Sequence, residues 1–309
     1  MSDGFIRRLF LLGRLVFRAL PGPYVKGAFW YAVLTPLLNH RSFETEATTA
    51  FGAVMRGSFP DTIHSRLFYF GIWEPCVTEV FRCTLQPGDI VIDIGANVGA
   101  HALLAASLVG PQGRVHAIEA SPSTLERLRW NVEANQVQNI VLHHVAVMDR
   151  HSRVTVHLNQ PENVGGTTVV DAFSDLYLSR ATIEASVEAR PLGDIVPLDD
   201  LLRARIIKID VEGAEWPVLQ GMRDVMGRLR DDVEILIEVA PEALKIHGVT
   251  LEDFLGFFES FGFSAYQISN EYDAGYYLNP PPLTLTPYVH RGKRLVDLLM
   301  SRRRPIAAA

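Results

Sequence analysis

Short apolar runs alternate with helical patterns through the centre of the chain. Apolar runs of strand length predict strands at residues 90–94, 114–119, 140–147, 206–210, 233–239 and 263–269. Apolar residues spaced three or four apart predict helices at residues 99–108, 122–135, 216–222 and 251–261. Strands that alternate with helices predict a mostly parallel sheet covered on both faces, which is a three-layer, doubly wound α/β fold.

Residues 5–20 have a different pattern, in which basic and apolar side chains occupy separate faces of one helix. At about 100° per residue, Arg7, Arg14 and Arg18 share one face. The apolar face is formed by Phe5, Leu9, Leu12, Val16 and Leu20. Such a helix can lie in the headgroup region of an anionic membrane, or it can pack on the domain with its arginines in water. Residues 27–38 are apolar but too few to span a bilayer.

The charge of the 309-residue chain is distributed unevenly. Lys and Arg exceed Asp and Glu by four in residues 1–38 and by five in residues 290–309, whereas the whole chain carries −6, so the stretch between carries −15. An acidic centre argues against a nucleic-acid groove, and the basic, apolar ends favour peripheral membrane contact through residues 5–38. Cys76 and Cys83 fit a reducing compartment. We therefore expect a cytoplasmic protein, peripheral on the inner face of the membrane.

These patterns divide the chain into three expected parts. Residues 1–60 form an N-terminal helical, basic and apolar segment, residues 61–275 form the α/β domain, and residues 276–309 form a basic C-terminal tail. The aromatic and proline-rich run after residue 271 fits no element clearly.

Candidate chemistry is concentrated after the first predicted strand, where the chain reads DIGANVG. Ligands of open α/β sheets bind beyond the carboxyl ends of the strands. Gly95 permits a tight turn close to a ligand, Asn97 tolerates a left-handed conformation, and Gly99 lets the next helix begin close to the sheet. Asp93 precedes the turn, and Glu119 ends the second strand, where it is placed for a ribose diol.

The spacing D-x-G-x-N-x-G distinguishes between nucleotide-like ligands. A dinucleotide fingerprint reads G-x-G-x-x-G and brings a pyrophosphate to a helix N-terminus. Here the third glycine is misplaced, and the carboxylate of Asp93 is unfavourable beside a pyrophosphate. A carboxylate suits S-adenosylmethionine, whose ammonium and sulfonium groups are positive. The turn therefore favours S-adenosylmethionine as the cofactor and disfavours a nicotinamide dinucleotide.

The motifs DIGANVG, KIDVEGAE and IEV, with Glu119 between the first two, occur in an order that resembles the FkbM-type class I S-adenosylmethionine-dependent methyltransferases. The segments FGIWEP and NVGGTT look like further features of that family. The resemblance covers roughly residues 61–269, so it implies that the α/β domain is a methyltransferase domain. It implies a seven-stranded sheet with one antiparallel strand, and methyl transfer that is usually directed to a hydroxyl oxygen.

The resemblance also implies roles for individual residues. The positions that match the cofactor site are Asp93, Gly95, Asn97, Gly99 and Glu119. The positions that match the motif at the fourth strand, beside the transferred methyl, are Asp210, Glu212 and Glu215.

A hydroxyl acceptor loses its proton on methylation, so a carboxylate or imidazole is expected within hydrogen-bond reach. Asp210 is predicted as the positioning group or base, and Glu212 as a residue of the acceptor pocket. Further candidates on the acceptor side are Glu74, Asn163, Gly166, Thr167 and Glu215. Glu215 has a simpler interpretation as a favourable charge in the first turn of its helix. No metal is expected, because Val239 replaces the oxygen ligand that would follow Glu238.

The combined prediction is an S-adenosylmethionine-dependent O-methyltransferase that acts on a hydroxyl of a sugar, a glycolipid or a secondary metabolite. Its expected partner is a small-molecule, glycan or lipid-linked acceptor, with no nucleic acid. Two alternatives stay open: a nicotinamide-dependent oxidoreductase, and a non-catalytic membrane-surface module that retains the cofactor pocket.

Overall fold

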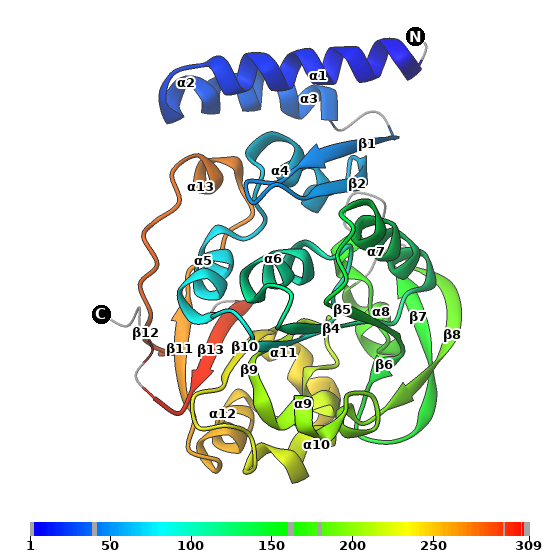
Figure 1. Ribbon diagram of the computed structural model, residues 1–309, viewed down its shortest axis with the longest axis vertical. Helices are drawn as coiled ribbons and strands as arrows, with labels where there is room; N and C mark the ends of the chain where they lie inside the picture. The colour runs from blue at the N-terminus through cyan, green and yellow to red at the C-terminus, as the bar shows by residue number, and fades with distance from the viewer. Residues whose placement is uncertain are drawn as a thin grey trace.

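The computed structural model describes residues 3–38, 42–159, 164–177, 181–292, 294–303 and 305. Its central sheet has the strand order β12-β11-β13-β10-β9-β3-β4-β5 (Figure 1). The strands are β3 (Ile90–Ile94), β4 (Arg114–Glu119), β5 (Ile140–His144), β9 (Ala204–Ile209), β10 (Glu234–Val239), β11 (Ser264–Ile268), β12 (Thr286–Pro287) and β13 (Val296–Ser301). The run from β5 to β10 is parallel, so the predicted mostly parallel α/β fold is confirmed.

The C-terminal half of the sheet differs from the expectation. Strand β13 runs antiparallel between β10 and β11, inside the sheet, although its residues were assigned to a basic tail. The two-residue strand β12 is an eighth strand, antiparallel to β11, where seven strands were expected. Basic residues on both sides of the short apolar run in β13 hid its strand character.

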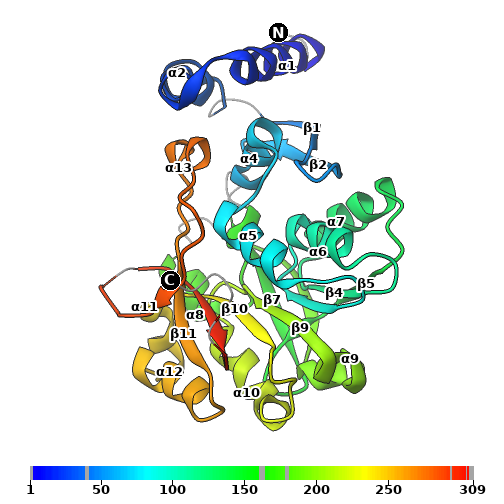
Figure 2. The same ribbon diagram turned by 60° about the vertical axis from the view of Figure 1, so that its left-hand side comes forward.

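Helices cover both faces of the sheet because successive strand residues point to opposite sides. Val91 joins the core under α5 (Pro75–Thr84), α6 (Ala100–Val109) and α7 (Pro122–Ala134). Ile92 joins the core under α9 (Leu198–Arg203), α10 (Glu215–Met226) and α12 (Leu251–Glu259). Figures 1 and 2 show these two helical layers with the sheet between them.

A second, three-stranded sheet lies beside the central one, in the order β6-β8-β7. The predicted strand at residues 140–147 is split, because its first part pairs with β4 as β5 and its last two residues pair with β8. The other elements that follow β5 in the chain are β6 (Ala146–Val147), β7 (Ser152–Leu158), α8 (Asp171–Tyr177), β8 (Thr182–Arg190), α11 (Pro241–Leu244) and α13 (Ala274–Leu278), with short 3₁₀ turns at Val164–Gly166, Leu192–Asp194 and Lys245–His247.

The N-terminal helices form a layer at one end of the molecule, beyond β1 and β2 (Figures 1 and 2). The elements are α1 (Asp3–Ala19), α2 (Gly22–Phe29), the π-helical segment η1 (Trp30–Leu34), α3 (Thr35–Leu38), β1 (Phe43–Thr48), β2 (Val54–Phe59) and α4 (Thr62–Phe70). Within the described part of the chain, no helix is both long enough and apolar enough to cross a bilayer.

The packing of α1 corrects the predicted helical faces. Phe10 and Phe17 are buried, and the ring of Phe17 meets Tyr69 of α4 edge to face at 5.7 Å between centroids. The guanidinium of Arg14 lies 4.6 Å from the Phe68 ring centre, on the inner side of the helix. Leu12, predicted on the apolar face with Val16, is 57% exposed. The face of α1 that carries Phe10 and Phe17 therefore packs against the protein, and part of the helix's apolar surface points outward.

Candidate functional site

The carboxyl ends of β3, β4, β9 and β10 border a cavity of about 570 Å³. The turn after β3, the loop after β9 and the segment before α5 form its walls. A cavity at this edge is the expected ligand site of an open α/β sheet. It has the size of a small-molecule or cofactor pocket.

The turn after β3 has the backbone that its glycines predict. Gly95 has φ +78° and Asn97 has φ +50°, both in the left-handed region. A Cβ on Gly95 would lie 1.8 Å from the carbonyl oxygen of Asp210, so only glycine fits between the two strand ends. The backbone N–H of Asn97 donates to Oε2 of Glu119 at 2.9 Å, which ties the turn to the end of β4.

Glu119 lines the cavity and is 8% exposed. Its Oε1 accepts a hydrogen bond from the backbone N–H of Ser121 at 2.8 Å. Burial raises the pKa of Glu119 to about 7, although the N–H groups of Ser121 and Asn97 act in the opposite direction. A ribose diol that donated to this carboxylate would favour its ionised form.

A buried ion pair connects β3 to β9 beneath the cavity. Nζ of Lys208 lies 2.8 Å from Oδ2 of Asp210 and 3.8 Å from Oδ1 of Asp93. Burial alone lowers the pKa of Lys208, but the carboxylates of Asp210, Asp93 and Glu74 together outweigh burial and raise its pKa above the ordinary lysine value. Burial raises the pKa of Asp93 to about 6, with Lys208 opposing the rise. Asp93 is 1% exposed and is not among the residues that line the cavity.

The loop after β9 holds Glu212 in the cavity wall. Glu212 has φ +49°, and its carbonyl oxygen accepts from Oγ1 of Thr168 at 2.6 Å. Burial and the neighbouring Asp210 raise the pKa of Glu212 well above the ordinary value. Oε1 of Glu215 accepts from the backbone N–H of Gly213 at 3.0 Å, so this side chain braces the loop and does not line the cavity.

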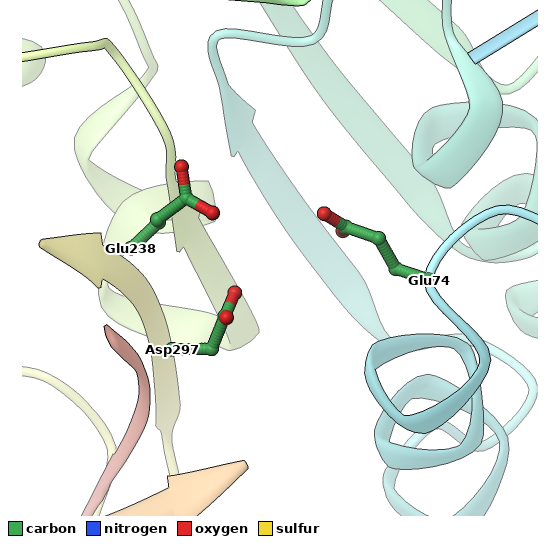
Figure 3. Close-up of side chains that lie close together, drawn as sticks. All are labelled: Glu74, Glu238 and Asp297. Carbon is green, nitrogen blue, oxygen red and sulfur yellow. The ribbon is translucent and has the colours of Figure 1, made fainter. Parts of the chain in front are cut away.

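A cluster of carboxyl groups faces the other end of the cavity, and Figure 3 shows Glu74, Glu238 and Asp297 pointing toward one another. The hydroxyl of Tyr272 lies 2.9 Å from both Oε1 of Glu74 and Oε2 of Glu238. Nδ2 of Asn270 lies 3.1 Å from Glu74 and 3.2 Å from Asp297. One hydroxyl proton cannot fully satisfy two ionised carboxylates, so this arrangement favours retention of a further proton.

The pKa shifts of the cluster agree with that geometry. Burial raises the pKa of Glu74 to about 7, with Lys208 opposing the rise and Asp210 adding to it. The pKa values of Glu238 and Asp297 are raised well above the ordinary range, again mainly by burial. The cavity therefore has groups that can hold or accept a proton near neutral pH.

His101 brings an imidazole to the same wall. It is 5% exposed, and its Nε2 has no hydrogen-bond partner among the described residues, although it lies 3.6 Å from Oε2 of Glu74. Burial lowers the pKa of His101 well below the ordinary value, so the ring is neutral at pH 7.

The structure brings most of the predicted site residues to the cavity. Those that line it are Glu74, Gly95, Asn97, Glu119, Thr167, Asp210 and Glu212. Those that lie behind the lining are Asp93, Gly99, Gly166 and Glu215. Asn163 lies outside the described residues. Gly99 is the N-cap of α6, where a Cβ would lie 2.4 Å from Leu128, so glycine here allows close packing.

Several residues of the site had no assigned role in the sequence. A lysine within the apolar strand Ile206–Ile209 is a signal that could have revealed Lys208, because a buried charge requires a partner. Tyr272 lies in the run that fitted no element, Asn270 lies just before that run, and Asp297 lies in the expected basic tail, so no local pattern indicates them.

The expectation about metals rested on an incomplete set of ligands. Oxygen atoms of Asp210, Glu212 and Glu238 lie within 4.8 Å of one another, as do those of Glu74, Glu238 and Asp297. The prediction considered only position 239, next to Glu238, as the source of a third oxygen ligand. Glu212, from the loop after β9, brings a third carboxylate close to Asp210 and Glu238. Lys208 already supplies a positive charge beside Asp210.

Comparison with known proteins identifies the family to which the chain belongs. The family model described as the methyltransferase FkbM domain matches residues 93–265, more than half of the chain. The chain belongs to the FkbM methyltransferase family. The matched region contains both the glycine turn and the KIDVEGAE loop.

Individual proteins and a solved structure are similar to the chain at low sequence identity. Methyltransferase 1 of Beauveria bassiana is 27% identical over 163 residues, covering 48% of this chain and 65% of that protein, less than two thirds of its length. The 31-O-demethyl-FK506 methyltransferase FkbM of Streptomyces tacrolimicus is 29% identical, covering 54% and 75%. The 2-O-methyltransferase NoeI of Sinorhizobium fredii is 26% identical, covering 53% and 72%. A SAM dependent methyltransferase from Aquifex aeolicus has a TM-score of 0.41 at 12% identity, covering 76% and 92%, and no conclusion rests on it.

Membership of the FkbM family confirms the predicted enzyme class, an S-adenosylmethionine-dependent methyltransferase. It removes the nicotinamide-dependent oxidoreductase from the alternatives. The roles of individual residues and the acceptor stay predictions.

Proposed function

We propose that this protein transfers a methyl group from S-adenosylmethionine to a hydroxyl oxygen of a sugar, a glycolipid or a hydroxylated secondary metabolite. The observation that carries the proposal is the acidic composition of the cavity wall. Five carboxyl groups line it, from Glu74, Glu119, Asp210, Glu212 and Glu238, against one amino group, from Lys208, among the described residues. Such a wall favours a ligand with cationic groups and disfavours a pyrophosphate.

The proposed cofactor site lies between the glycine turn and Glu119. Gly95 and Asn97 of the turn both line the cavity. Glu119, at the end of β4, would accept hydrogen bonds from the ribose hydroxyls. Asp93 would act from beneath the turn through its charge, without direct contact.

Asp210 and Glu212 are proposed as the catalytic groups. S-adenosylmethionine, when bound, supplies a methyl group already activated by its sulfonium. The acceptor oxygen forms its bond to the methyl carbon while the sulfur–carbon bond breaks and its electron pair stays on sulfur. The acceptor proton passes to a carboxylate, for which Glu212 is suited by its raised pKa. Asp210, held by Lys208, would orient the acceptor hydroxyl.

The acceptor class is supported by the relatives and by the cavity. The names of the Streptomyces and Sinorhizobium relatives both specify methylation at oxygen. Trp73 stacks on Tyr272 at 5.4 Å between ring centroids and lines the cavity, so an aromatic surface is available to a sugar ring or an apolar metabolite. Peripheral membrane contact through residues 5–38 belongs to the same proposal and would favour a lipid-linked acceptor.

Transfer of labelled methyl groups tests the reaction. The full chain is incubated with methyl-labelled S-adenosylmethionine and a cell extract, which is then divided into lipid, glycan and small-molecule fractions. We expect label in one fraction that resists mild alkali, because methyl ethers survive treatment that cleaves methyl esters. Glu212→Gln is expected to lower the rate by a factor of about 10² to 10⁴, whereas Glu242→Gln, at a side chain that is 61% exposed, is not. Cofactor binding without any transfer would instead favour the non-catalytic module.

A further inference from the structure

Exposed apolar side chains are concentrated in the N-terminal helices. Among the described residues, thirteen large apolar side chains are exposed, and eight of them lie between residues 11 and 33. These eight are Leu11, Leu12, Leu15, Val16, Tyr24, Val25, Tyr31 and Val33. Such a concentration on one segment marks an interaction surface rather than chance exposure.

Four of these side chains form one outward face of α1. Leu11, Leu12, Leu15 and Val16 fall within an arc of about 140° at about 100° per residue, opposite Phe10 and Phe17, which pack inward. Leu15 is 67% exposed and Leu12 is 57% exposed. Figures 1 and 2 show α1 at the outer end of the molecule, with its outward side free of other described elements. We define Leu11, Leu12, Leu15 and Val16 as the outer apolar face.

The charged residues in the segment that carries this face, from residue 4 to residue 43, are all basic. Residues 4–43 contain no Asp or Glu, whereas Arg7, Arg8, Arg14, Arg18 and Lys26 all lie within them. Arg8 and Arg18 are exposed. Two copies of the chain that met through this face would bring these cations together, so a second copy is disfavoured. An anionic surface is complementary to both the apolar and the basic side chains.

A second cavity lies where α1 and α2 meet the rest of the protein. Its volume is about 580 Å³, and Arg18 and Lys26 both line it, together with the hydroxyl-bearing Thr48 and Thr49. No acidic side chain is among the described residues that line it. Aromatic rings complete the walls, including that of Phe17. Two cations beside hydroxyl groups and apolar walls match the phosphate of an anionic phospholipid and the start of its chains.

We propose that the protein docks on an anionic membrane, with the outer apolar face of α1 among the lipid headgroups and a lipid phosphate held between Arg18 and Lys26. The proposal deepens the peripheral contact proposed above and does not depend on methyl transfer. Helix α4, which packs against α1 through Tyr69, also supplies Thr62 and Ile63 to the cavity at the sheet. Docking would therefore bring the wall that α4 forms in that cavity toward the lipid surface.

Vesicle sedimentation of the full chain, without any methyl donor, tests the proposal. Vesicles of phosphatidylcholine alone are compared with vesicles containing equal parts of phosphatidylcholine and phosphatidylglycerol. The wild type is expected to bind the anionic vesicles at least tenfold more tightly. Leu12→Glu with Leu15→Glu is expected to weaken binding to both vesicles by tenfold or more. Arg18→Gln with Lys26→Gln is expected to weaken binding to the anionic vesicles alone, by roughly thirtyfold for two cations.

Matched substitutions elsewhere on the surface serve as controls. Ile183→Glu changes a side chain that is 73% exposed on β8, and Arg150→Gln with Arg228→Gln removes two exposed cations; all are expected to behave as the wild type. Unchanged thermal melting of each variant excludes misfolding.

Three outcomes would overturn the docking proposal: equal binding to both vesicles, no effect of the α1 substitutions, or a concentration-dependent dimer that these substitutions abolish. Failure of methyl transfer with intact vesicle binding would instead overturn the proposed reaction.

Discussion

Replacement of Lys208 by methionine tests the ion pair that joins the two motif-bearing strands. Methionine preserves the length and packing of the side chain but removes the cation that lies 2.8 Å from Asp210 and 3.8 Å from Asp93. The Lys208 side chain is 8% exposed and that of Asp93 is 1% exposed, so solvent screens this pair weakly. Removal of one partner from a buried pair costs roughly 3–5 kcal/mol of unfolding free energy. We expect a loss in this range at pH 8.

The loss of unfolding free energy should depend on pH, and the pKa of Asp93 determines the direction of that dependence. In the wild type the pKa of Asp93 is raised mainly by burial, to about 6, with Lys208 opposing the rise. Without Lys208 this pKa rises further, so the folded variant binds a proton that the unfolded chain does not. A group whose pKa is raised in the folded state stabilises the fold at low pH. This stability is lost as the pH rises through the folded-state pKa, by about 1.4 kcal/mol per pH unit. The deficit of Lys208→Met should therefore shrink as pH falls from 8 to 6.

Urea denaturation at pH 6, 7 and 8 measures this deficit. Lys245→Met is the matched control, because that lysine is 66% exposed and its pair with Glu242 is worth under about 1 kcal/mol. In the double variant Lys208→Met, Asp93→Asn, the pH dependence should become smaller, because asparagine takes up no proton, although Glu74, whose pKa Lys208 also lowers, still titrates. A deficit below about 1 kcal/mol, or one equal at pH 6 and pH 8, would refute the reasoning.

Three further predictions concern the site. Gly95→Ala should lower the unfolding free energy by more than the about 1–2 kcal/mol that a left-handed alanine costs by itself, because the added Cβ would also lie 1.8 Å from the Asp210 carbonyl oxygen. An unchanged melting curve would contradict that close approach. If ribose hydroxyls donate to ionised Glu119, as proposed, binding of S-adenosylhomocysteine should tighten as pH rises from 6 to 8, because burial raises the pKa of this carboxyl to about 7 in the free protein. In titration calorimetry Glu119→Gln should bind more weakly with a reduced pH dependence, and an unchanged profile would exclude this role. Chelation with EDTA should leave the rate within about twofold, because Lys208 already supplies a cation beside Asp210; a requirement for Mg²⁺ or Mn²⁺ would assign Asp210, Glu212 and Glu238 to a metal.

The sequence was sufficient for the parallel half of the sheet. In β3 and β4 a mainly apolar segment leads to a carboxylate and is followed by a turn or cap signal, so local pattern and tertiary position agree. The same agreement places the turn residues Gly95 and Asn97 beside Glu119, because neighbouring parallel strands end at the same edge.

The sequence was insufficient where tertiary contacts override the local pattern. Strand β13 has only a short apolar run among basic residues, and its place between β10 and β11 depends on pairing with strands far away in the chain. The carboxyl cluster depends on that pairing, because Asp297 reaches Glu74 across more than two hundred residues. On α1, helical periodicity alone does not show that Phe10 and Phe17 outweigh the leucines in choosing the buried face.

Titration calorimetry with S-adenosylhomocysteine tests the central claim that this cavity holds an adenosyl ligand on carboxylate-bearing walls. The account predicts saturable binding of one ligand per chain, weakened by Glu119→Ala and left unchanged by Glu133→Ala, which alters an exposed carboxylate on α7. No binding to the wild type, or equal affinity of the Glu119→Ala variant, would contradict it.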